Sequence, residues 1–311
     1  MAGGLFSAIW TDLFQIHVAL VGFIASAGYV LYTRGFSNLL AAVPVEKLDT
    51  TGLLSIGGGA LTNWAGLVSL ALGNAMALDF MERVFAADSP NTAKRGCYYA
   101  GVLTIVIGAC ATILGLAAIP TIPTIGDTRM VLPTFATNHL PFWMGMMVFL
   151  GVLGASMSTA NGAILVISVV LARNIVQRWT PRNFTDRELL NLSRFMAIPT
   201  ALAAGLLAWW KPEPGILLVV AFDIVFAGCV VPLFLGVYWK KATSLSAIMA
   251  VVAGTTCRAI AYFVTPPTWA GLDTLLPPVV SLAAFYITAK LTAKGSEAEA
   301  NTGVLAAEGA N

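Results

Sequence analysis

The stretch FWMGMMVFLGVLGASMSTANGAILVISVVLA, residues 142–172, contains no Asp, Glu, Lys or Arg. A membrane-spanning helix needs about 20 predominantly apolar residues, because each residue advances about 1.5 Å through a hydrocarbon core of about 30 Å. This stretch exceeds that length, so we predict a helix that spans a bilayer and either tilts or continues beyond it. Small residues and hydroxyls interrupt its apolar character between positions 154 and 162.

The rest of the chain repeats this apolar pattern. Of its 311 residues, 58% are hydrophobic and only 10% are charged, whereas a soluble domain carries about 25% charged residues. We therefore predict an all-α, polytopic membrane protein with a transmembrane domain over 1–294. A tail over 295–311, rich in Ala, Gly and Glu, is predicted to be disordered. The eight predicted spans cover residues 9–32, 61–81, 98–119, 142–172, 190–210, 215–239, 244–264 and 276–291.

The basic residues between the spans predict an orientation. Twelve Lys and Arg residues fall on the side of the two termini and four on the opposite side. Because cytoplasmic loops carry the excess of Lys and Arg, we expect both termini in the cytoplasm and the protein in the plasma membrane. The net charge is only +2, so these residues indicate topology, and no nucleic-acid partner is expected.

The composition also argues against an enzyme. The chain has two histidines and four cysteines, with no CxxC pair and no HExxH motif. We interpret the cysteines inside apolar stretches as small apolar packing residues and not as zinc ligands. We expect no catalytic activity and no cofactor.

Ionisable residues inside spans are costly, which makes them functional candidates. Asp12 is either an acid lining a cation path or an interfacial carboxylate bonded to water. Asp223 lies roughly 12 Å along its helix from Gly215, near the middle of the bilayer. It is either functional or a structural partner of Arg258, which we expect to reach toward the outer surface with its long side chain.

Two groups of uncharged polar residues are further candidates. The adjacent hydroxyls of Ser158 and Thr159 can bind an alkali cation, which prefers oxygen ligands; the alternative is that they bond back to their own helix. Gly73 beside Asn74 favours local unwinding, and a broken helix offers backbone groups to a ligand. The alternative at that position is a packing notch.

Several stretches, in this order, resemble the sodium/solute symporter family, which includes bacterial proline and sodium/sugar symporters. The resemblance covers positions 3 to about 241, nearly four-fifths of the chain. It is carried by Gly3-Gly4-Leu5 with WTDLFQ at 10–15, LGN at 72–74 with DFMERVFAA at 79–87, ASMSTA at 155–160, and AG at 227–228 with GVYWK at 236–240. Glu82 stands where the family usually has Gln.

The resemblance implies a leucine-transporter-type fold, an inverted repeat of two five-helix units. Span 9–32 would be the fifth core helix, spans 61–81 to 215–239 the second repeat, and the last two spans extra helices. The family's first repeat has no counterpart here, so the chain is expected to be a C-terminal piece, with a partial fold and a missing N-terminal half as a partner.

The resemblance also implies roles for individual residues. Sodium would be bound by the Ala155 carbonyl, Ser158 and Thr159, and Asp12 would lie near the inward exit route of the ion. Gly73 and Asn74 would border the substrate, and Asp223 lies in a helix that contributes to the substrate site. The expected function is sodium-coupled transport of a small polar solute by alternating access, incomplete in this chain. The alternative is a membrane scaffold or accessory subunit without ion coupling.

Overall fold

The computed structural model describes residues 4–122, 126–182 and 184–308. Within these ranges the chain is helical and contains no β-strand. Eight of the described helices are long and apolar enough to cross a membrane. The all-α, polytopic fold predicted from the apolar stretches is therefore confirmed.

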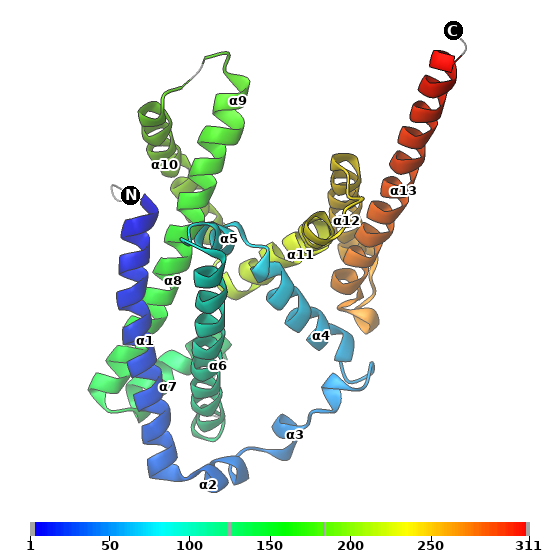
Figure 1. The fold of residues 1–311 in the computed structure, drawn as a ribbon. Coiled ribbons are helices and arrows are strands. Elements are labelled where there is room, and N and C mark those ends of the chain that lie inside the picture. Colours follow the sequence, from blue (N-terminus) through cyan, green and yellow to red (C-terminus); the bar gives the residue numbers. More distant parts are fainter. Residues whose placement is uncertain (1–3, 123–125, 183, 309–311) are drawn as a thin grey trace. The chain divides into compact units, whose positions relative to one another are not determined.

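The chain divides into two compact units (Figure 1). Unit 1 comprises Met1–Asp49 and Glu82–Leu207, and unit 2 comprises Thr50–Met81 and Ala208–Asn311. One transmembrane domain over 1–294 was predicted, so the division into two units is an addition from the structure.

Unit 1 is built around a helix pair, α1 (Gly4–Arg34) and α8 (Phe142–Val170). A Cβ on Gly22 would lie 2.8 Å from the Met147 carbonyl carbon, and a Cβ on Gly151 would lie 2.8 Å from the Cα of Ala19. Glycine at these positions lets the two backbones approach closely, as is typical of helices in membranes. The contacts run in opposite directions along the two helices, so the pair is antiparallel.

The remaining helices of unit 1 extend this pair. Phe23 of α1, Leu114 of α6, Phe135 of α7 and Val148 of α8 belong to one buried apolar cluster. The elements are α2 (Phe36–Ala41), α3 (Val45–Leu48), α6 (Pro90–Thr121), the 3-10 turn Thr128–Met130, α7 (Val131–His139), the π-helical segment η4 (Leu171–Val176), α9 (Gln177–Trp179) and α10 (Asp186–Trp210).

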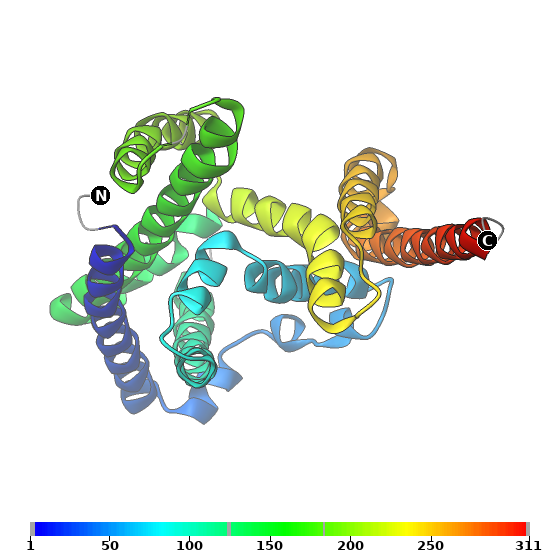
Figure 2. The same ribbon diagram turned by 45° about the horizontal axis from the view of Figure 1, so that its top comes forward.

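Unit 2 contains α4 (Ala60–Val68), the π-helical segment η2 (Ser69–Gly73), α11 (Pro214–Tyr238), α12 (Ser244–Val264) and α13 (Leu272–Glu308), with 3-10 turns at Thr51–Leu53 and Pro267–Trp269. Helices α12 and α13 lie side by side (Figure 2). Gly254 of α12 packs directly on the Ala227 carbonyl of α11, where a Cβ would clash. The Ser281 hydroxyl of α13 donates to the Ala250 carbonyl at 3.0 Å.

Predicted span 61–81 is interrupted in the structure. After η2, the helix breaks at Met76 and Ala77, and α5 (Leu78–Phe85) follows, with the boundary between the two units inside it. Local unwinding at Gly73-Asn74 was expected because glycine weakens a helix. A π-helical turn ending at Gly73 and a break shortly afterwards are observed.

Most span boundaries match within a few residues, and 244–264 coincides with α12. The structure differs from the prediction at the C-terminal end. Span 276–291 begins one turn earlier, at Leu272, where Asp273 accepts a hydrogen bond from the Gly271 N–H, and Pro277 and Pro278 lie inside α13. The tail over 295–311, expected to be disordered, is helical as far as Glu308, because Ala and Glu favour helix, and residues 309–311 lie outside the described ranges.

Candidate functional site

The three residues predicted to bind sodium lie together on α8. Ala155 and Thr159 are exposed and Ser158 is half-buried. The Thr159 hydroxyl donates to the Ala155 carbonyl at 3.1 Å, which is the back-bonding geometry weighed above as the alternative. The Ala155 carbonyl also accepts the helical Thr159 N–H, so both of its lone pairs are engaged, while the Thr159 hydroxyl oxygen keeps its own. The two oxygens lie 3.1 Å apart on residues that are both exposed.

Helix α1 brings a second polar group to the same level of α8. Gln15 packs on Gly154, where a Cβ would lie 3.0 Å from the Gln15 Cβ. Because α1 and α8 are antiparallel, one further turn along each helix places Asp12 opposite Ser158. The antiparallel register therefore predicts that Asp12, expected on the ion exit path, lies at the level of Ser158.

Asp12 is held by an arginine that sequence reasoning had counted only as a loop charge. The Arg83 Nη2 lies 3.0 Å from Asp12 Oδ2, and the two side chains are 32% and 21% exposed. Within the described ranges, Asp12 Oδ1 and Gln15 Oε1 are buried and lack a hydrogen-bond partner. Unpaired buried oxygens are costly and require an explanation, such as an ion or a water.

The pair of Asp12 and Gln15 had a detectable signal in the sequence. Residues three apart on a helix lie on the same face, so the motif WTDLFQ already predicts that these side chains are neighbours. The partnership with Arg83 had no such signal, since 71 positions separate it from Asp12.

The predicted substrate residues Gly73 and Asn74 occupy the end of η2 in unit 2. Gly73 is buried, and a Cβ there would lie 2.6 Å from the Phe222 carbonyl oxygen of α11. This close contact is the packing notch that the sequence analysis gave as the alternative at Gly73. Asn74 is exposed, and the break at Met76 and Ala77 follows directly.

Asp223 stands beside Phe222 and belongs to a buried cluster of charged groups. Its Oδ2 accepts from Arg258 Nη2 at 3.1 Å and from the Thr274 hydroxyl at 3.2 Å. Arg258 Nη1 also donates to Asp273 Oδ2 at 2.9 Å. Two carboxylates thus share one guanidinium.

The pairing of Asp223 with Arg258 is the structural alternative stated from the sequence. Arg258 is 9% exposed and points into unit 2, so the expectation that it reaches outward to water was wrong. Among the described side chains, Asp223 Oδ1 and Arg258 Nε are buried without a hydrogen-bond partner. Asp223 therefore keeps one acceptor that no described donor satisfies.

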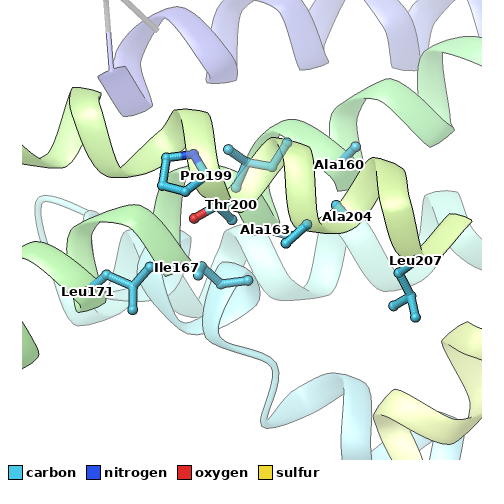
Figure 3. Close-up of a pocket in the computed structure, with 10 residues that line it drawn as sticks. Ala160, Ala163, Ile167, Leu171, Pro199, Thr200, Ala204 and Leu207 are labelled. Atoms are coloured by element: carbon cyan, nitrogen blue, oxygen red, sulfur yellow. The ribbon is translucent and has the colours of Figure 1, made fainter.

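An apolar groove separates α8 and α10 within unit 1 (Figure 3). Its volume is about 520 Å³. The labelled side chains run from Leu171 and Pro199 at one end to Ala160 and Leu207 at the other. The Thr200 hydroxyl, which also lines it, bonds back to the Met196 carbonyl at 2.8 Å.

Comparison with known proteins indicates the family to which this chain is related. The model of the sodium:solute symporter family matches residues 1–254. The chain is 25% identical to the sodium/glucose cotransporter of Vibrio parahaemolyticus, over 81% of this chain and 52% of that protein. It is 26% identical to the sodium/proline symporter of Haemophilus influenzae, over 81% and 52% respectively. It is 23% identical to the human high affinity choline transporter 1, over 82% and 46%.

A solved structure shares the fold. A Na+-coupled sialic acid symporter in a substrate-bound outward-open state superposes with a TM-score of 0.71 and 16% identity, covering 93% of this chain and 63% of that one. This likeness agrees with the predicted partial leucine-transporter-type fold. The chain spans about half the length of the curated relatives it matches.

The family-wide match and the eight apolar helices establish a multi-pass membrane protein. The ordered motifs quoted from the sequence lie inside the matched region, and the helices that carry them take up the fold of a symporter. The chain belongs to the sodium:solute symporter family.

Proposed function

We propose that this chain takes part in sodium-coupled transport of a small polar solute across the plasma membrane by alternating access, with both termini in the cytoplasm. The family match and the sodium-coupled relatives support this reading. Helices outside this chain, equivalent to an N-terminal half, complete the machinery, because three oxygens on α8 cannot replace the hydration shell of a sodium ion.

The observation that carries the proposal is the cluster of oxygens on one surface of α8. The Ala155 carbonyl and the Thr159 hydroxyl lie 3.1 Å apart on two exposed residues, and the helix register predicts Ser158 at the level of Asp12. Hard cations bind oxygen ligands of this kind. We assign sodium binding to Ala155, Ser158 and Thr159.

Asp12 and Gln15 supply the next polar atoms along α1. Asp12 Oδ1 and Gln15 Oε1 are buried acceptors, and Asp12 lies closer to the N-terminal end of α1, which the charge distribution predicts to be cytoplasmic. We assign Asp12 to the exit path of the ion. Arg83 holds the carboxylate in place and competes with the ion for it.

The substrate is assigned to the broken helix of unit 2. Asn74 is exposed beside the break, and Gly73 sets the spacing between η2 and α11. Asp223 contributes the unsatisfied Oδ1 as an acceptor. A solute with a hydrogen-bond donor would suit this atom, while the charge of the carboxylate is largely balanced by Arg258.

The proposal is tested by sodium binding and uptake. The chain is reconstituted in proteoliposomes together with the N-terminal half of a relative, and binding of radioactive sodium is measured for the unmodified chain, Ser158→Ala and Thr159→Ala. Thr112→Ala is the matched control, because Thr112 on α6 is also exposed and bonds back to its own helix at Gly108. We expect lost sodium binding in the two α8 variants only. Unchanged binding in both would refute the assigned site.

A second experiment tests the alternative function, a membrane scaffold or accessory subunit without ion coupling. Sodium-stimulated uptake of glucose, proline and choline, the solutes named in the relatives, is measured in cells that produce this chain together with the N-terminal half of a relative. Sodium-stimulated uptake that disappears in Thr159→Ala supports transport. A chain that assembles but gives no sodium-stimulated uptake of any tested solute, and binds no sodium, is a scaffold.

A further inference from the structure

The connection between α12 and α13, residues 265–271, contacts the start of α4, which is the first half of the broken helix. The Thr62 hydroxyl donates to the Ala270 carbonyl at 2.9 Å. Gly271 has a positive φ of 97°, and a Cβ there would lie 2.6 Å from the Thr62 nitrogen. Only glycine fits both this backbone conformation and this close approach. We call this connection the strap, because it holds α4 to the last two helices.

One carboxylate fastens the strap to α12. Asp273 Oδ1 accepts a hydrogen bond from the Gly271 N–H at 2.9 Å, and Asp273 Oδ2 accepts from Arg258 Nη1 at 2.9 Å. The Asp273 side chain is 20% exposed, whereas that of the other acid bonded to Arg258, Asp223, is 7% exposed. Water can therefore replace Arg258 at Asp273 more readily than at Asp223.

The other ion pair of Arg258 is only partly bonded. Its Nη2 donates to Asp223 Oδ2 at 3.1 Å, but among the described side chains Asp223 Oδ1 and Arg258 Nε are buried without a hydrogen-bond partner. One of these two atoms is an acceptor and the other is a donor. A guanidinium carries its N–H donors in a rigid fork that matches both oxygens of a carboxylate. A small movement would therefore convert the single bond into a paired one and satisfy both atoms.

The first turn of α13 holds this pair in its one-bond form. Asp273 takes Arg258 Nη1, and the next residue, Thr274, donates to Asp223 Oδ2 at 3.2 Å. Adjacent residues of α13 thus each bond one member of the pair. Drawing the guanidinium over to Asp223 Oδ1 would take its Nη1 away from Asp273. The paired form gains the stronger two-bond geometry and loses the bond to the carboxylate that fastens the strap, so the two arrangements compete.

A bound ion does not explain the two unpaired atoms. A cation at Asp223 Oδ1 would lie beside the guanidinium, and an anion at Arg258 Nε would lie beside the carboxylate, so an ion of either sign meets a like charge. A buried donor and a buried acceptor left unpaired are costly. The atoms that can satisfy them without a ligand are each other.

We propose that residues 265–271 form a releasable strap. It is fastened when Arg258 bonds both Asp223 and Asp273. It is released when Arg258 pairs with both oxygens of Asp223, and the Asp273 carboxylate is then hydrated. Release frees the start of α4, and with it the broken helix to which the proposed function assigns the substrate. The strap requires neither sodium nor solute, so its test is independent of the transport test.

Hydrogen–deuterium exchange of the full chain in lipid nanodiscs tests the strap, read by mass spectrometry on peptides that cover the strap and the start of α4. Asp273→Asn weakens the fastening, so we expect exchange about tenfold faster in these peptides. Asp223→Asn should slow it about threefold, because the amide oxygen still accepts from Arg258 whereas the amide N–H₂ cannot pair with Nε–H. A static cluster would loosen in both variants, so opposite changes identify the switch.

Glu213→Gln is the matched control, since Glu213 lies in the same unit and pairs with Lys211. It should leave exchange in the strap unchanged. Unchanged exchange in α6, which belongs to unit 1, verifies that each variant is folded. Strap exchange that is not slower in Asp223→Asn, or not faster in Asp273→Asn, would overturn the proposal.

A distance measurement tests the two arrangements in the chain with its charged cluster intact. Spin labels are attached at Leu67→Cys and Trp269→Cys, two exposed positions on α4 and in the strap, after the four native cysteines are replaced by alanine. We expect two separations between the labels, and the longer one should disappear when Asp223→Asn is added. A single separation that Asp223→Asn and Asp273→Asn leave unchanged would overturn the releasable strap.

Discussion

Each unit contains an aspartate on a membrane-spanning helix that is paired with one arginine. The two ion pairs differ in how deeply they are buried and in how many further contacts they make. In both, the arginine Nη2 lies about 3 Å from an aspartate Oδ2, and the aspartate Oδ1 is buried without a partner among the described residues. The side chains of Asp12 and Arg83 are 21% and 32% exposed, whereas those of Asp223 and Arg258 are 7% and 10% exposed.

The surroundings of the two pairs differ as well. Arg258 holds a second carboxylate, Asp273, and the Thr274 hydroxyl also donates to Asp223. These contacts tie α11, α12 and α13 together. A deeply buried, multiply bonded pair is suited to fixing helices, while a partly exposed pair can exchange its cation. We therefore expect an architectural role for the pair in unit 2 and, under the proposed function, ion handling for the pair in unit 1.

The largest effect is expected from removing the shared arginine. Arg258→Met leaves two carboxylates without their cation, and breaking a buried ion pair costs about 3–5 kcal/mol. The free energy of unfolding is measured by titration with a denaturing detergent in mixed micelles. The double variant with Asp223→Leu should recover most of the loss, because an apolar pair often replaces a buried ion pair at little cost. A single variant as stable as the unmodified chain would contradict the architectural role.

A smaller loss is expected from the hydroxyl that supports Asp223. Thr274→Val keeps the shape of the side chain and removes one hydrogen bond to a charged group, which costs about 1.5–3 kcal/mol. Thr265→Val is the control, because Thr265 lies in the connection between α12 and α13 and belongs to no charged cluster described above. Equal losses in the two variants would mean that the hydroxyl contributes nothing specific to the cluster.

The contrast between the pairs also shows where sequence reasoning succeeded and failed. Apolar stretches predicted all eight spans, because lipid demands long apolar helices whatever their partners. Asp12, Asp223 and Arg258 stood out because ionisable groups are rare at membrane depth. The pairing of Asp223 with Arg258 was an open alternative, since both lie inside spans.

Other features depend on tertiary packing and had no local signature. Arg83 looks like any loop arginine, and only the arrangement of α1 and α5 brings it to Asp12. Asp273 was missed because the prolines at 277 and 278 suggested a later start of the last helix. The sodium assignment to Ala155, Ser158 and Thr159 stays a prediction, as do the substrate roles of Gly73, Asn74 and Asp223.

A third prediction separates the two pairs by function. Arg83→Met should cost about 1 kcal/mol of stability or less, because partly exposed ion pairs contribute little. It should also raise the affinity for sodium, since the ion no longer competes with a guanidinium for Asp12. Radioactive sodium binding is measured beside the unfolding titration. Sodium affinity that falls in Arg83→Met would mean that the arginine shapes the site and does not compete for it.

The smallest expected effect concerns salt. Raising the ionic strength from about 0.1 M to about 1 M shortens the screening length from about 10 Å to about 3 Å, and buried pairs are screened much less than exposed ones. Double-mutant cycles for Asp12 with Arg83 and for Asp223 with Arg258, run in potassium chloride to avoid sodium binding, should show a coupling energy that falls with salt only in unit 1. The expected drop is a few tenths of a kcal/mol, since the whole coupling of a partly exposed pair is about 1 kcal/mol or less. An equal drop in unit 2 would show that water and ions reach Asp223 as readily as Asp12, and the division of roles between the two pairs would fail.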